Sequence, residues 1–118
     1  MTKTLLLVDD SRVSRMMIQT VILQSYPDWQ VLEAGDGKAA LELTRNQTFD
    51  IAIVQLNASN LNGLELAEKL MIKHPQSDYA LITDNTKNVV DNKAVKLGLS
   101  LIEKPVTEAK LKAFLSNC

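Results

Sequence analysis

Residues 49–63 decide the fold of this chain and read Phe-Asp-Ile-Ala-Ile-Val-Gln-Leu-Asn-Ala-Ser-Asn-Leu-Asn-Gly. Residues 51–56 form a short apolar run rich in β-branched side chains, typical of a strand buried on both faces of a parallel sheet. The polar, asparagine-rich second half ends at Gly63, which predicts a turn before the next helix. In an open α/β sheet, ligands and chemistry lie at the carboxyl end of a central strand. Gln55 occupies that position here, so the site holds an amide where a carboxylate could have stood.

Strands and helices are predicted to alternate along the whole chain. The other four predicted strands are residues 4–8, 30–34, 79–83 and 99–103. Helices are predicted after Asp10 or Ser11, over residues 39–44, 63–74 and 89–97, and from Thr107 onward. The apolar residues of the first helix, expected to face the core, are Val13, Met16, Met17, Ile18 and Val21. Strict alternation predicts an α/β fold, with a doubly wound five-stranded parallel sheet in the flavodoxin-like order 2-1-3-4-5.

Composition and charge limit the classes of function. A length of 118 residues predicts a single domain over residues 1–118. The net charge of −1, without a basic tract, argues against a nucleic acid or an anionic membrane as partner. No segment approaches the ~20 apolar residues of a membrane span. Cys118 is the only cysteine and cannot pair within the chain, so a reducing, cytoplasmic location is expected.

Polar residues follow the first, third, fourth and fifth predicted strands. The motifs are Leu-Val-Asp-Asp at 7–10, Phe-Asp through Asn-Gly at 49–63, Leu-Ile-Thr at 81–83 and Glu-Lys-Pro at 103–105. In this order and at these spacings, the chain resembles the receiver domain of bacterial response regulators, of the single-domain chemotaxis (CheY-like) type. The resemblance covers essentially the whole length.

The resemblance implies a role for each of these residues. Asp9 and Asp10 look like Mg²⁺ ligands, one direct and one through water, and the carbonyl of Asn57 looks like the family's backbone ligand to the same ion. Thr83 resembles the hydroxyl that hydrogen-bonds a phosphoryl group. Lys104 resembles the ammonium that pairs with that group or with its carboxylate. The peptide bond before Pro105 is often cis in this family.

The departures from the family pattern favour the interpretation of the chain as a pseudo-receiver. The phosphoacceptor aspartate falls on Gln55, and a neutral amide oxygen is not a useful nucleophile toward phosphorus. Ala58 and Ser59 replace a Met-Pro pair. Asp84 replaces a small residue, adding charge where a phosphoryl donor would approach, and Leu101 replaces the aromatic residue that couples phosphorylation to a surface change.

The leading hypothesis is therefore a non-enzymatic signalling module of a two-component phosphorelay system, without catalytic residues. Gln55 is interpreted as a hydrogen-bond partner of Lys104 in a retired site. No cofactor is required, and Mg²⁺ binds weakly if at all. The expected partner is a histidine kinase, an output domain or another signalling protein, and a homodimer is a further alternative. The docking surface is the fourth helix, fifth strand and fifth helix, with candidates Val90, Leu101, Lys104, Glu108 and Lys112.

Two other hypotheses stay open at this stage. One is a conventional phosphorelay receiver, either an engineered Gln55 variant or a receiver phosphorylated atypically, with Thr83 or Ser59 as hydroxyl candidates. The other is a cation-binding scaffold in which Asp84 joins Asp9 and Asp10.

Overall fold

The structure, a computed structural model, describes residues 2–58, 61–84, 94 and 96–118. Its main sheet is built from the strands β1 (Thr4–Val8), β2 (Gln30–Ala34), β3 (Ile51–Gln55), β6 (Asp78–Thr83) and β7 (Ser100–Glu103). The five strands are parallel and lie in the order β2-β1-β3-β6-β7. Counted along this sheet, the order is 2-1-3-4-5, so the predicted doubly wound, flavodoxin-like architecture is confirmed.

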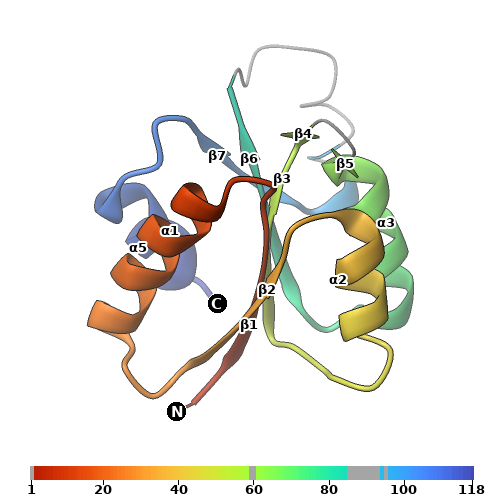
Figure 1. Ribbon diagram of the computed structural model, residues 1–118, viewed down its shortest axis with the longest axis horizontal. Helices are drawn as coiled ribbons and strands as arrows, with labels where there is room; N and C mark the ends of the chain where they lie inside the picture. Colours follow the sequence, from red (N-terminus) through yellow and green to blue (C-terminus); the bar gives the residue numbers. More distant parts are fainter. Residues whose placement is uncertain (1, 59–60, 85–93, 95) are drawn as a thin grey trace.

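Helices cover both faces of the sheet. Figure 1 shows α1 (Arg12–Ser25) and α5 (Glu108–Leu115) on one face, and α2 (Gly37–Leu43) and α3 (Gly63–Lys73) on the other. Ser11, one of the two residues expected to cap the first helix, caps α1, and Thr107, where the last helix was expected to start, caps α5. The helix predicted over residues 89–97 lies largely outside the described residues. Within the described ranges, no helix is long and apolar enough to cross a bilayer.

The core consists of two layers, one on each side of the sheet. Successive side chains of β1 point to opposite faces, so Leu5 and Leu7 pack with α1 and α5, and Leu6 and Val8 pack with α2 and α3. Every residue of β3 is buried, as expected for the central strand of a parallel sheet. The carboxyl ends of the strands therefore lie together at one edge of the sheet. The two core layers pack against the strands on both sides and fix the position of that edge.

The predicted inward face of α1 is wrong in its first two turns. Val13, Met16 and Met17 are 66%, 59% and 63% exposed, whereas Ile18 and Ile22 are buried. Residues four apart share one face of a helix, and the face that meets the sheet carries Ile18 and Ile22. The apolar residues before Ile18 consequently project outward and form an exposed patch.

A small ribbon follows the central strand where the sequence predicted only a turn. β4 (Asn57–Ala58) and β5 (Leu61–Asn62) pair in antiparallel fashion. The side chain of Asn62 then caps α3 by accepting a hydrogen bond from the amide of Glu65 at 3.2 Å. The amide of Gly63 donates to the carbonyl of Leu56 at 2.9 Å, which closes the connection tightly against the end of β3.

Candidate functional site

The structure brings the predicted site residues to the carboxyl edge of the sheet. The register places Val8 opposite Val54, Gln55 opposite Ile82, and Thr83 opposite Glu103, so the residues that follow these strands are neighbours. Asp9, Gln55 and Thr83 are buried there, while Asp10 and Lys104 are exposed. The edge thus combines a buried carboxylate, a buried amide and a buried hydroxyl beside two exposed charges of opposite sign.

Gln55 is held by the backbone of the neighbouring strand end. Its side chain is 8% exposed, and its Oε1 accepts a hydrogen bond from the amide of Asp10 at 3.4 Å. The expected hydrogen bond between Gln55 and Lys104 is wrong: Lys104 Nζ lies 3.6 Å from Asp84 Oδ1 and pairs with that carboxylate. Because the side chains of Lys104 and Asp84 are 38% and 72% exposed, the ion pair contributes little to stability.

Each carboxylate oxygen of Asp9 accepts a hydrogen bond from a donor at the start of α1. Oδ1 accepts from the amide of Ser11 at 2.8 Å, and Oδ2 accepts from Ser14 Oγ at 2.6 Å. Arg15 Nη1 donates to the backbone carbonyl of Asp9 at 2.6 Å, and Arg15 Nε pairs with Glu33 Oε1 at 3.2 Å. The first turns of α1 therefore hold the ends of β1 and β2 together.

Ser14 and Arg15 are the site residues that the sequence reading missed. A signal was present, because Ser14, Ile18 and Ile22 are spaced by four residues and share one face of the helix. Taking that face as the inward one would have directed Ser14 toward the strand end.

The donor set fits a tightly held Mg²⁺ poorly. Asp9 already accepts two short hydrogen bonds, and Gln55 supplies a neutral amide where a third carboxylate could stand. Asn57, the expected backbone ligand, lies in β4 opposite Asn62. Among the described residues, no group of three or more His, Cys, Asp or Glu side chains could hold a metal ion. The scaffold hypothesis with Asp9, Asp10 and Asp84 is therefore wrong, because Asp84 is directed to Lys104.

The remaining predicted residues occupy β6, β7 and the loop after them. Thr83 is 3% exposed, and its carbonyl accepts from the amide of Lys104 at 2.9 Å. The peptide bond between Lys104 and Pro105 is cis. Leu101 is partly buried, lies opposite Leu81 and packs against the core layer of α2 and α3. Ser59 and Val90 lie outside the described residues.

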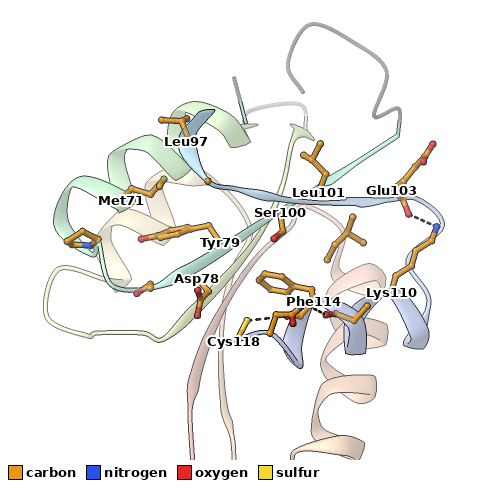
Figure 2. Close-up of a pocket in the computed structure, with 16 residues that line it drawn as sticks. Met71, Asp78, Tyr79, Leu97, Ser100, Leu101, Glu103, Lys110, Phe114 and Cys118 are labelled. Atoms are coloured by element: carbon orange, nitrogen blue, oxygen red, sulfur yellow. Dashed lines mark hydrogen bonds between the residues drawn. The ribbon is translucent and has the colours of Figure 1, made fainter. Parts of the chain in front are cut away.

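A groove runs along the outer strand β7, with Glu103 at the carboxyl end of that strand among its lining residues and Cys118 at its other end. It has a volume of about 700 Å³ and lies between α5 and the α3 side of the sheet (Figure 2). Leu101 and Phe114 line it, and Lys110 Nζ donates to the carbonyl of Glu103 at 2.9 Å at one end. At the other end, burial raises the pKa of the Cys118 thiol to about 11, so this cysteine is a poor nucleophile at neutral pH.

A second groove, of about 990 Å³, separates α1 from the loop before α5. Its walls include Val13, Met16 and Met17 on one side and Pro105 and Val106 on the other. It adjoins the carboxyl edge, since Asp84 and Lys104 also line it.

Comparison with known proteins agrees with this architecture. A chemotaxis protein CheY homolog of Campylobacter jejuni is 35% identical, with 96% of this chain and 89% of that protein covered. The probable transcriptional regulatory protein TcrX of Mycobacterium tuberculosis is 29% identical over 80% of this chain. This chain spans only 38% of TcrX and 37% of stress response regulator protein 1 of Debaryomyces hansenii.

Solved structures show the same fold. Chemotaxis protein CheY4 of Vibrio cholerae superposes with a TM-score of 0.89 at 22% identity, over 99% of this chain and 98% of that one. The CheY-like receiver domain protein of Methanospirillum hungatei superposes with a TM-score of 0.88 at 20% identity, over 99% and 93%. The family described as the response regulator receiver domain matches residues 5–116. The chain belongs to the response regulator receiver domain family.

Proposed function

We propose that residues 1–118 form a receiver-like module of a two-component system that is not phosphorylated at the usual site and acts by binding a protein. Gln55 carries this proposal. It stands at the carboxyl end of β3 as an amide, and its oxygen is bonded to the amide of Asp10. An acyl phosphate forms by attack of a carboxylate oxygen, and a neutral amide does not replace that nucleophile.

The pairing of Lys104 supports the same proposal. In a working site its ammonium would serve the phosphoryl group, but here it is paired with Asp84 at 3.6 Å. A dianionic phosphate donor approaching this edge would meet the exposed carboxylates of Asp84 and Asp10. Both features disfavour phosphoryl transfer, and the donor set gives no reason for a required cofactor.

Incubation with Mg²⁺ and acetyl phosphate, followed by mass spectrometry of the intact protein, tests the proposal. We expect no added phosphoryl group on the natural chain. Gln55→Asp is the matched positive control, because it restores a carboxylate at the same strand end. A phosphoryl group mapped to residues 51–63 or to Thr83 of the natural chain would overturn the proposal and favour the atypical receiver.

We place the partner on the face formed by β7 and α5. Lys104, Glu108 and Lys112 are exposed there, and Lys112 Nζ pairs with Glu108 Oε1 at 2.9 Å. Leu101 lies in the groove along β7, so this face combines apolar and charged side chains (Figure 2). A kinase, an output domain and a second copy of the chain all remain candidate occupants, in a cytoplasmic setting.

The exposed patch of Val13, Met16 and Met17 favours α1 as a second candidate docking face. Large apolar side chains that gather on a surface mark interaction sites more often than single exposed ones do. Affinity capture with Met16→Lys and with Lys112→Ala, compared with the natural chain, tells which face binds. If Met16→Lys abolishes partner binding and Lys112→Ala does not, the docking face lies on α1.

A further inference from the structure

The carboxylate of Asp9 is 1% exposed, yet the cation that this family places beside it fits the site poorly. A buried charge is costly unless hydrogen bonds or an opposite charge compensate it. The guanidinium of Arg15 is directed to the backbone carbonyl of Asp9 and to Glu33, not to the carboxylate of Asp9. The compensation therefore comes from two donors at the start of α1, the amide of the N-cap residue Ser11 and Ser14 Oγ.

We propose that Ser14 is a positioning residue that satisfies the Asp9 carboxylate in place of a divalent cation. Its hydroxyl donates to Asp9 Oδ2 at 2.6 Å, within the range of hydrogen bonds to a carboxylate. The amide of Ser11 fills Oδ1 at 2.8 Å. A cation that bound Asp9 directly would have to share the two carboxylate oxygens with both donors.

The position of Ser14 in the helix explains why its hydroxyl holds this place. Ser14 lies one turn before Ile18 and two turns before Ile22, both buried against the sheet. The packing of those residues fixes the rotation of α1 and directs Ser14 to the end of β1. The start of a helix also carries partial positive charge, which favours the carboxylate.

This inference extends one part of the proposed function, namely that the module needs no metal ion, and it rests on that part alone. Phosphate incorporation tests the proposed function, and the experiment below measures the response of folding to a cation. The two can fail separately, because a chain that is never phosphorylated could still respond to Mg²⁺.

Ser14→Ala provides the test, with thermal unfolding followed in a chelator and then in about 10 mM Mg²⁺. We expect the natural chain to unfold at the same temperature in both solutions. The variant should unfold at a lower temperature in chelator and recover most of that loss in Mg²⁺. Calorimetric titration should show Mg²⁺ binding about tenfold tighter than in the natural chain, equivalent to about 1.4 kcal/mol.

Two further variants serve as controls. Ser77→Ala removes a hydroxyl that donates at the same 2.6 Å, to the carbonyl of Phe49, before the start of β6. It should be destabilised without any recovery in Mg²⁺. Ser14→Thr keeps a hydroxyl and should stay insensitive to the cation.

The outcomes divide cleanly. Recovery in Mg²⁺ for Ser14→Ala alone, including recovery of a variant that fails to fold in chelator, supports the proposal. The proposal is overturned if the unfolding temperature of the Ser14→Ala chain does not rise in Mg²⁺, or if this chain folds in neither solution. A natural chain that Mg²⁺ stabilises as much as the variant also overturns it.

Discussion

Replacing Gly63 by alanine should be among the most damaging single-methyl additions to this protein. A Cβ at this position would lie 2.2 Å from the carbonyl oxygen of Gln55, 2.8 Å from Leu56 Cα and 2.9 Å from the carbonyl carbon of Gln55. All three atoms are backbone, so no side chain can rotate away. Overpacking of a closed site costs roughly 1–3 kcal/mol, and we expect the upper end, about 3 kcal/mol.

Urea unfolding followed by circular dichroism, together with a thermal scan, measures this effect. For a domain of this size, about 3 kcal/mol corresponds to a fall of about 12 °C in Tm. Gly35→Ala is the matched control, because its Cβ would meet only the end of the Arg15 side chain at 3.6 Å. That control should stay within about 0.5 kcal/mol of the natural chain. A Gly63→Ala chain within the same margin would refute the close approach of α3 to the end of β3.

Four other substitutions and a change of pH have defined outcomes. Gln55→Asp should accept phosphate slowly without changing partner affinity, since Leu101 lacks the ring that the family uses as a readout; a tenfold change (about 1.4 kcal/mol) on phosphorylation contradicts this. Met16→Lys should alter the free energy of unfolding by less than about 0.5 kcal/mol, whereas Ile22→Ala should cost about 3 kcal/mol in urea titrations. Burial raises the pKa of Cys118 from 9.0 to about 11 and that of Tyr79 from 10.0 to about 12. The unfolded chain releases these protons first, so stability should be full below about pH 9 and fall between pH 9 and 12. Tyr79→Phe should show a smaller decline of the urea midpoint over that interval.

The sheet could be predicted because each strand is recognisable from its own short stretch of sequence. Leu5 to Val8 and Ile51 to Val54 are continuous apolar runs, and burial on both faces requires such runs in a parallel sheet. Their alternation with helices then leaves few topologies, and the predicted order was among them.

The rotation of α1 could not be obtained in the same way. Val13, Met16 and Met17 form a more apolar-looking face than Ser14, Ile18 and Ile22 do. Local periodicity favoured the face with Val13, Met16 and Met17, but the face that contacts the sheet is the one with Ile18 and Ile22. That face also carries Ser14, whose hydroxyl donates a hydrogen bond to the buried carboxylate of Asp9. Polar residues on an inward face thus become understandable only when the partner across the interface is known.

The sequence predicted which residues lie at the candidate site, but not which side chains there bind to one another. Strand ends place Asp9, Gln55, Thr83 and Lys104 at one edge whatever their side chains do. Which carboxylate Lys104 pairs with depends on the path of the chain after β6, and that path brings Asp84 within 3.6 Å. The roles assigned to these residues stay predictions.

The stack of Tyr26 on Trp29 has a practical consequence for spectroscopy. The ring centroids lie 4.0 Å apart with planes inclined by 13°, just before β2 begins at Gln30. The carboxyl edge lies at the far end of that strand, about 16 Å away at roughly 3.3 Å per residue. Indole emission from this single tryptophan should therefore report loss of the fold while remaining silent to an ion at Asp9. One sample can then yield an optical measure of the folded fraction and a calorimetric measure of ion uptake without either signal contaminating the other.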